Sequence, residues 1–162
     1  MTIRVPLAWL AAALVVALVY PVSLLAKGQI EVVAKFQRPN LELDVATYSD
    51  PEFESPGNKI GLLGFASGPV RNSFSLRGEE WTQLTDLWAK ATRMQSRKQW
   101  RTVGTLSERG TAEVSRLTLS AGQGVRLAIT SPKGASMAFL VGRADMARFE
   151  AAIAQVKDIL AK

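Results

Sequence analysis

Residues 74–88, with the sequence FSLRGEEWTQLTDLW, contain a change of period that predicts a strand followed directly by a helix. Phe74 and Leu76 alternate with serines, which is the period-two pattern of a half-buried strand. From Trp81 onward, apolar residues recur at steps of three or four, as on one face of a helix. Two glutamates open this helix, where the helix dipole favours negative charge. The chain is organised around this junction.

The same design returns 65 positions later, in residues 139–153, FLVGRADMARFEAAI. Without a gap, Ser55–Ala91 aligns with Ser120–Val156, and the two segments share apolar positions more than identical residues. Matched positions include Ile60/Val125, Leu62/Leu127, Leu76/Val141, Trp81/Met146, Leu84/Phe149 and Trp88/Ile153. The architecture is therefore predicted to repeat.

Placing strands around these two junctions gives the order of four strands and a helix, twice. Short turns between consecutive strands imply antiparallel meanders, and a helix covering one face of each meander makes the fold class α+β. The domain spans residues 29–162 in two halves, 29–96 and 97–162. The expected elements are strands at 30–37, 41–45, 60–65 and 70–76, a helix at 79–95, strands at 100–106, 112–119, 125–129 and 135–141, and a helix near 144–160.

An N-terminal hydrophobic segment precedes the domain. Residues 5–26 contain no charged side chain, and Arg4 and Lys27 flank them. Residues 1–28 are therefore a signal peptide or a single membrane anchor. The small residues at Ala26 and Gly28 favour cleavage, whereas the length of the uncharged run favours an anchor. Either way we expect the domain to be periplasmic or secreted, or held at the inner membrane by this segment.

The composition excludes most catalytic chemistry. The chain has no cysteine and no histidine, which removes thiolate nucleophiles, the Ser-His-Asp arrangement and nearly every zinc site. The loop carboxylates Asp50, Glu52 and Glu54 are the only candidates for Ca²⁺, but they lack EF-hand spacing. No Walker or dinucleotide glycine pattern occurs. We expect a protein that is not an enzyme and that has neither a cofactor nor a metal site.

The charge is unevenly distributed along the chain. The formal net charge is +6, but residues 27–86 sum to −3 and residues 87–162 to +8. The densest basic stretch contains one tryptophan and forms the candidate binding site for a polyanion: Arg93, Arg97, Lys98, Trp100 and Arg101.

Three interpretations of this basic stretch compete. The residues solvate a helix end and an edge strand, or they face the acidic stretch formed by Glu42, Asp44, Asp50, Glu52 and Glu54, in the same chain or another subunit. Alternatively they bind a polyanion, namely anionic lipid head groups, acidic polysaccharide or nucleic acid. A tryptophan among basic residues suits unpaired bases, because bases stack on aromatic planes while cations neutralise the backbone.

The predicted topology resembles that of one family of single-strand DNA-binding proteins and one family of transcriptional coactivators. Four antiparallel strands and a helix, twice in one chain, resemble the Whirly group, and one such unit resembles the positive cofactor four group. In the latter, the fourth strand enters the helix through a pattern similar to Phe74-Ser75-Leu76 followed by Glu79-Glu80-Trp81 and Leu84. The residue-level match is confined to this junction. The resemblance implies a single-stranded nucleic-acid-binding domain.

The same strand-to-helix ending also resembles small exported bacterial proteins of the invasion-associated locus B kind, although those usually carry cysteines. The small size, the lack of a catalytic constellation and the leader favour a non-catalytic bacterial envelope protein, exported or membrane-tethered, that binds a partner protein or an envelope polyanion. The alternative is the nucleic-acid-binding domain of Whirly-like topology. Expected partners are an envelope protein, an anionic polymer or lipid head groups, with nucleic acid second and the membrane through residues 5–26 if the leader is retained.

Overall fold

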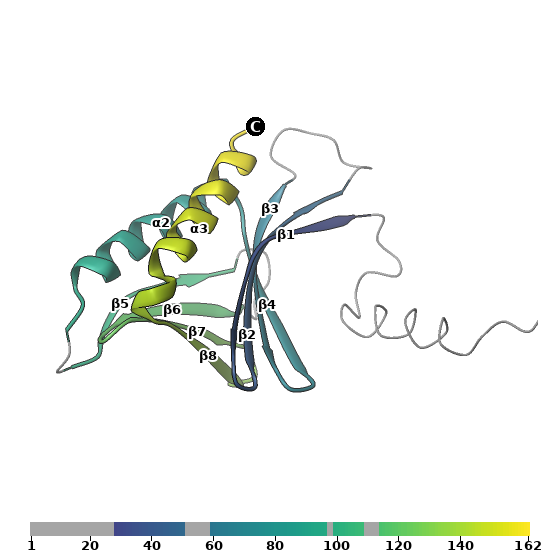
Figure 1. The fold of residues 1–162 in the computed structure, drawn as a ribbon. Helices are drawn as coiled ribbons and strands as arrows, with labels where there is room; N and C mark the ends of the chain where they lie inside the picture. Colours follow the sequence, from purple (N-terminus) through teal and green to yellow (C-terminus); the bar gives the residue numbers. More distant parts are fainter. Residues whose placement is uncertain (1–27, 51–58, 97–98, 109–113) are drawn as a thin grey trace, which may run out of the picture.

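Two four-stranded antiparallel sheets, each followed by a helix, form the molecule (Figure 1). The computed structural model describes residues 28–50, 59–96, 99–108 and 114–162. The predicted α+β class and the repeated unit are confirmed. The leader and most of the acidic loop after residue 50 lie outside the described residues.

The first sheet has the strand order β1-β2-β3-β4. Leu43, Leu63 and Phe74 lie on its inner face, where they are fully buried, while residues between them along each strand face outward. This is the alternation that the sequence predicted. The elements of this half are β1 (Gln29–Arg38), β2 (Leu41–Ser49), β3 (Ile60–Ser67), β4 (Val70–Leu76) and α2 (Gly78–Arg93).

The second sheet has the order β5-β6-β7-β8 and the same alternation. Leu119, Leu127 and Phe139 form its buried inner row. The strand expected at 112–119 is shifted, since pairing begins at Arg116 and continues to Ala121. The elements of this half are β5 (Arg101–Ser107), β6 (Arg116–Ala121), β7 (Val125–Thr130), β8 (Ser136–Val141), the short 3₁₀ helix η2 (Arg143–Asp145) and α3 (Met146–Leu160).

The repeat extends to the irregularities of the sheets. In both halves the first strand carries a β-bulge. It lies between Val32 and Ala34 in β1 and between Thr102 and Gly104 in β5. A bulge inserts one extra residue and increases the local twist. The two sheets are therefore bent at equivalent places, although the sequences there share little.

The ungapped alignment of the halves is wrong by one residue in the third strand. Leu63 pairs with Phe74 in the first sheet, and Leu127 pairs with Phe139 in the second, so Leu127 corresponds to Leu63 and not to Leu62. The cause is the longer turn between β7 and β8. One residue of slip reverses every side chain of a strand, and Leu62 accordingly faces outward.

One helix covers the inner face of each sheet, and the two halves exchange their helices. Helix α2 packs mainly on β5 and β6, and α3 packs on β1, β2 and β3, while the two helices contact one another. The Leu87 side chain of α2 lies against Gly104 of β5. A single core between the two sheets results, so neither half buries its apolar surface alone.

Arginines tie α3 to the first sheet. Arg38, at the end of β1, forms an ion pair with Asp145 at the start of α3, and its guanidinium lies 5.9 Å from the centre of the Phe139 ring. Arg148 of α3 donates to the Lys35 carbonyl oxygen at 2.9 Å and stacks over Phe36. The Lys35 carbonyl belongs to an edge strand, so this contact also covers part of that edge.

Trp81 lies at the centre of the shared core. Its indole nitrogen donates to the Ile153 carbonyl oxygen of α3 at 2.8 Å, and its ring lies directly over Gly61 of β3. Trp88 lies two turns further along the same face of α2. Its ring centre is 4.4 Å from that of Phe149, but its buried indole nitrogen has no hydrogen-bond partner in the described structure. Both tryptophans therefore bury their rings, but only the Trp81 indole nitrogen is hydrogen-bonded.

This difference predicts unequal costs for the same substitution. Trp81→Phe should lower the free energy of unfolding by about 1–2 kcal/mol more than Trp88→Phe, because only the first change removes a made hydrogen bond. Urea denaturation of both variants checks this. Equal losses, or a larger loss for Trp88→Phe, would contradict the assigned role of the Trp81 hydrogen bond.

Candidate polyanion-binding surface

The structure separates the residues of the predicted basic stretch. Arg93 is the last residue of α2 and is exposed on the helix side, where its Nε donates to the Ala89 carbonyl. Arg101 opens β5 and pairs with Ala121 of the inner row, so it lies at the rim of the inner face. Trp100 lies on the outer side. Arg97 and Lys98 fall outside the described residues.

Trp100 forms one corner of the outer face of the second sheet. Its ring is 41% exposed and covers Gly122, where an added Cβ would lie 2.5 Å from the indole. The Arg126 guanidinium lies 5.5 Å from the centre of the ring, within range of a cation–π contact. Arg126 pairs across the sheet with Leu140, which is 38% exposed. Trp100, Gly122, Arg126 and Leu140 are called the Trp100 corner below.

Ser96, which follows α2, is bound beside this corner. The Ser96 backbone nitrogen donates to the Gly122 carbonyl oxygen at 3.0 Å, and Gly122 donates to the Gly124 carbonyl oxygen at 2.9 Å. The turn between β6 and β7 thus holds the chain just before Trp100. A tryptophan held by Gly122 and Arg126 and still 41% exposed can contact a ligand with the rest of its apolar surface.

The rest of the outer face consists mainly of small side chains, many of which carry a hydroxyl group. Thr105 and Thr118 share a hydrogen bond of 3.1 Å across β5 and β6, and alanines continue this row on β7 and β8. The cross-strand registers place no carboxylate among the described residues of this face. Its members are Thr102, Thr105, Ser107, Arg116, Thr118, Ser120, Arg126, Ala128, Thr130, Ser136, Ala138 and Leu140.

Arg116 and Arg126 are therefore the charged residues of this face among the described residues. Neither was among the residues predicted to bind a polyanion. Both arginines are exposed, and neither forms an ion pair within the described parts of the chain. The alternation of Val125-Arg126-Leu127 was the available signal, because it places Arg126 outward on a strand. Its position beside Trp100 depends on the pairing of three strands, β5, β6 and β7, which the alternation does not reveal.

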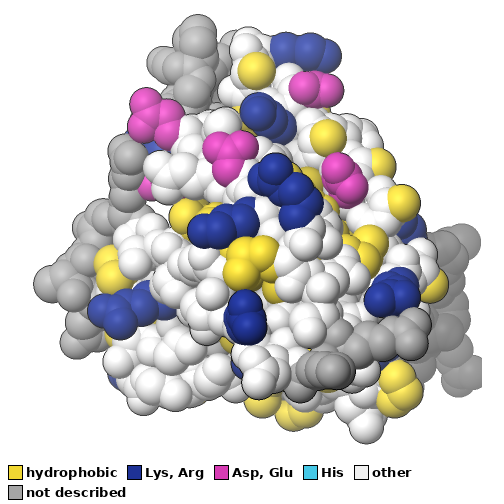
Figure 2. Space-filling view, turned by 90° about the vertical axis from the view of Figure 1, so that its left-hand side faces the viewer, with side chains coloured by type: hydrophobic (Ala, Val, Ile, Leu, Met, Phe, Trp, Pro, Cys, Tyr) yellow, Lys and Arg dark blue, Asp and Glu magenta, His cyan; other side chains and the backbone are white. Residues whose placement is uncertain are grey.

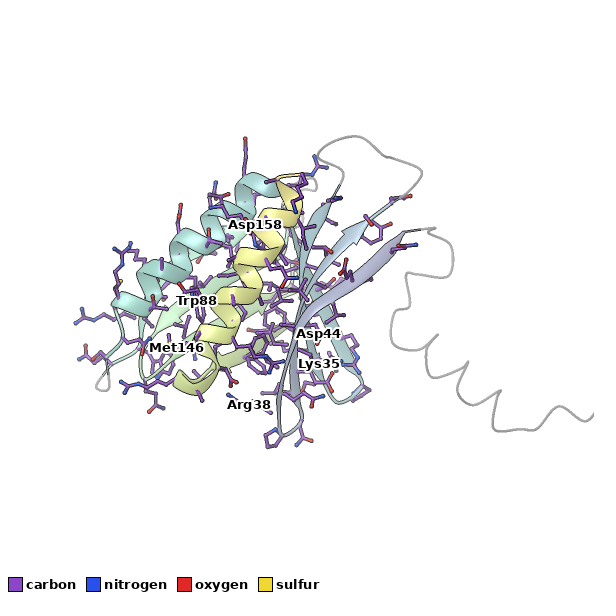
Figure 3. All side chains as sticks on the ribbon, turned by 45° about the horizontal axis from the view of Figure 1, so that its top comes forward. Lys35, Arg38, Asp44, Trp88, Met146 and Asp158 are labelled. Atoms are coloured by element: carbon purple, nitrogen blue, oxygen red, sulfur yellow. The ribbon has the colours of Figure 1, made fainter. Side chains whose placement is uncertain are left out.

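The outer face of the first sheet carries charge of both signs. Lys35 lies 3.7 Å from both Glu42 and Asp44, and Arg71 lies 3.5 Å from Glu42. Figure 3 shows Lys35 and Asp44 as neighbours on this sheet. The acidic residues of β2 thus pair with bases of their own sheet and do not face the basic stretch. This surface offers no excess of positive charge to an anion.

The charge pattern is visible from the side in Figure 2, which shows the left-hand side of Figure 1. Carboxylates lie in the upper part of this view, whereas the coloured charges in its lower part belong to Lys and Arg. The second sheet lies at that lower level in Figure 1.

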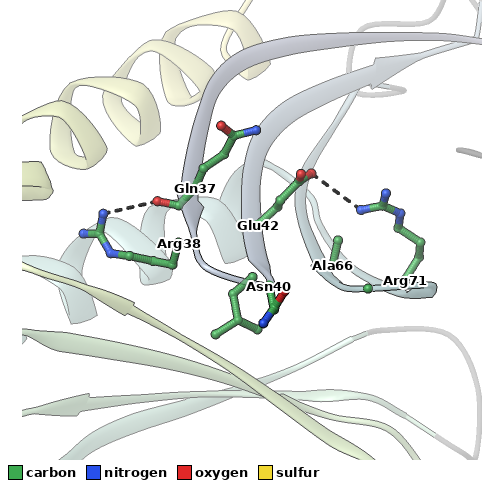
Figure 4. Close-up of a pocket in the computed structure, with 8 residues that line it drawn as sticks. Gln37, Arg38, Asn40, Glu42, Ala66 and Arg71 are labelled. Carbon is green, nitrogen blue, oxygen red and sulfur yellow. Dashed lines mark hydrogen bonds and ion pairs between the residues drawn. The ribbon is translucent and has the colours of Figure 1, made fainter.

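An open hollow of about 270 Å³ lies at the hairpin ends of the first sheet (Figure 4). An ion pair between Arg71 and Glu42 borders it, and Arg38 is already bound by Asp145. Its charged groups are thus mutually satisfied. None of the predicted site residues lines this hollow, whose walls are Gln37, Arg38, Asn40, Leu41, Glu42, Ala66, Gly68 and Arg71.

Asp44 is a partly buried carboxyl on the outer face of the first sheet. Burial raises the pKa of Asp44 above its ordinary value of 3.8, and the Glu42 carboxylate acts in the same direction, while Lys35 and Arg71 oppose this rise. The folded protein thus holds the Asp44 proton more tightly than the unfolded chain. Its contribution to stability is present below the ordinary pKa and is lost as the pH rises through the folded pKa.

Asp44→Asn should remove this pH dependence. We expect the stability of the variant relative to wild type to increase as the pH rises from about 3 to about 7, because only wild type loses the contribution of the protonated carboxyl. Urea denaturation of both proteins across this range measures the difference. A variant that becomes relatively less stable with rising pH would contradict the raised pKa.

Comparisons with known proteins add no relative. Neither the family models nor the curated proteins give a match to this chain. In the described ranges, no group of carboxylates is arranged to hold a metal ion, and no helix is long and apolar enough to cross a membrane. Residues 5–26, Glu52 and Glu54 lie outside those ranges.

Proposed function

We propose that this chain is a non-catalytic bacterial envelope protein, exported or membrane-tethered, that binds an extended polyanion on the outer face of its second sheet. The observation that carries the proposal is the difference between the two outer faces. The second presents Arg116, Arg126 and an exposed Trp100 with no carboxylate among its described residues, whereas Lys35 and Arg71 on the first face are paired with acids.

The chemistry of this face suits an acidic polysaccharide. Two arginines on β6 and β7 bind carboxylate or sulfate groups through charge-assisted hydrogen bonds. The threonine and serine hydroxyls between them both donate and accept, as sugar hydroxyls require. Trp100 supplies a flat apolar surface at one end. The acidic surface of a partner envelope protein would use the same arginines.

Single-stranded nucleic acid is the second candidate, and the contact between Arg126 and Trp100 favours it. Unpaired bases stack on aromatic rings while arginine neutralises phosphates. The topology resembles that of the Whirly group, as noted above. The hydrophobic leader favours an extracytoplasmic ligand instead, and for that reason we place polysaccharide first.

Titration of the protein with defined probes tests the proposal. The probes are a polygalacturonate oligomer, a heparin oligosaccharide, an oligothymidylate and a neutral dextran, each labelled for fluorescence anisotropy. We expect binding of the acidic sugars that weakens steeply with salt, and none of dextran. Preference for oligothymidylate would establish the second candidate. Absence of binding to every acidic probe would reject both.

The subcellular location of the protein requires a separate measurement. Fractionation of cells that express the native chain, followed by the N-terminal mass, distinguishes a cleaved leader from a retained one. A start near Gln29 in the soluble periplasm supports an exported protein, and an intact Met1 in the membrane fraction supports tethering. A domain that faces the cytoplasm would contradict the envelope assignment.

A further inference from the structure

The outer face of the first sheet changes character along its strands. At the hairpin end it carries the paired charges of Lys35, Glu42, Asp44 and Arg71. At the opposite end, where β1 begins, the outward row is apolar. This apolar band consists of Ile30, Val32, Ala46, Tyr48, Ile60 and Leu62.

The register establishes that this band faces away from the core. Val32 pairs with Ala46, and Ala46 pairs with Leu62, while Val45 and Leu63 occupy the buried inner row. Val32 is 44% exposed, and Leu62 is half-buried. The sheet turns this face away from both helices (Figure 1). Gly28 lies against the Tyr48 ring and Ala46 is only 4% exposed, so Val32 is the most exposed residue of the band.

The equivalent row of the second sheet has the opposite chemistry. Thr102 takes the place of Val32, and Arg126 takes the place of Leu62. Since the backbones of the two halves are equivalent there, the difference belongs to the side chains alone. The apolar band is therefore a property of one sheet and not a requirement of the fold.

The position of the band indicates what covers it. Residues 5–26 contain no charged side chain, and only Lys27 and Gly28 separate this run from β1. A tether that short keeps the start of β1 close to whatever holds the run. Tyr48, with its apolar ring and polar hydroxyl, is a residue type enriched where protein meets the lipid head groups.

We propose that the apolar band lies against the bilayer surface, inserted at the boundary between head groups and acyl chains. This inference rests on the proposed tethering. The described charges beside the band are Glu31, Asp50 and Lys59, with one more acid than base. Contact with lipid therefore depends on apolar burial and is insensitive to salt, unlike binding at the second sheet. The second sheet remains free to bind its polyanion in water.

The absence of cysteine permits a site-specific test. A nitroxide label on Val32→Cys reports on the band, and the same label on Leu140→Cys is the matched control, because both residues are exposed apolar residues on outer faces. The full chain is reconstituted in vesicles of phosphatidylethanolamine and phosphatidylglycerol. Electron paramagnetic resonance then measures how often each nitroxide collides with oxygen, which concentrates in lipid, and with a nickel chelate, which stays in water.

We expect the Val32 label to favour oxygen and the Leu140 label to favour the chelate, with no change in high salt. A Val32 label in water on a vesicle-bound chain would overturn the inference and leave the tethering intact. Dipolar broadening between labels at Val32 would show a second copy in place of lipid and would overturn it too. A chain that does not sediment with vesicles would overturn both. Unchanged melting temperatures confirm that the labelled variants fold.

Discussion

Gly61→Ala is expected to lower the free energy of unfolding by about 3 kcal/mol and the melting temperature by about 10 °C. The backbone of Gly61 does not have the positive φ that would itself require glycine. The obstacle is the fully buried Trp81 ring, into which the new methyl group would project. Trp81 has no room to move, because its indole is bound to Ile153 of the opposite helix.

Two variants make this prediction specific. Gly64→Ala, in the same strand, is the control, since its new Cβ would meet only the Asp44 Cβ at an ordinary 3.5 Å. The double variant Gly61→Val with Trp81→Met installs the pair that the repeat places at the equivalent positions of the second half. We expect the double variant to be more stable than Gly61→Val alone. If Gly61→Ala and Gly64→Ala melt at the same temperature, the assigned packing is wrong.

Trp100→Ala and Arg126→Ala are each expected to weaken binding of the preferred polyanion about tenfold. An aromatic stack contributes about 1–3 kcal/mol, and hydrogen bonds to a charged group contribute about 1.5–3 kcal/mol. Arg126→Ala should also reduce the slope of log affinity against log salt by about 1, because one fewer counterion is released. Trp100→Ala should leave that slope unchanged. Anisotropy titrations at several salt concentrations measure both quantities.

Arg93→Ala is the matched control for these variants. It removes the same charge from an exposed position that adjoins the site in sequence but lies on the helix side of the molecule. We expect a change in affinity of less than about twofold, from long-range attraction alone. A loss as large as that of Arg126→Ala would mean that the linear basic stretch, and not the outer sheet face, forms the binding surface.

Local patterns were sufficient to predict most of the elements. The change from period two to period three or four at Gly78 is decided within a few residues, and α2 begins there as expected. The Glu80 side chain accepts a hydrogen bond from the Arg77 backbone nitrogen at 2.8 Å, which stabilises this helix start. The stripe of Trp81 and its successors is buried as predicted.

The helix exchange depends on information that no local pattern contains. An apolar stripe fixes which face of α2 is buried, but both sheets offer an equally apolar inner face. The choice is made by side-chain fit, such as Leu87 over Gly104 and Arg148 over Phe36. The register of β7 escaped prediction for a related reason, since it depends on the length of a turn.

The candidate site was predictable only in part. Trp100 was selected for its basic neighbours in sequence, yet the structure places Arg126 beside it through the pairing of β6 and β7. Strand alternation sends Arg101 to the opposite side of β5. Because neighbours along a strand face opposite ways, a linear cluster of charges is divided between two surfaces when it enters a sheet.

The most direct test of the proposed function is a map of the bound polyanion on the folded protein. Amide and arginine side-chain NMR signals are followed while the preferred acidic oligomer is added. We predict that the shifted signals cluster on the outer face of the second sheet, including Trp100, Arg116, Thr118 and Arg126. Shifts confined to the helices, the first sheet or the hairpin hollow would contradict the proposed surface.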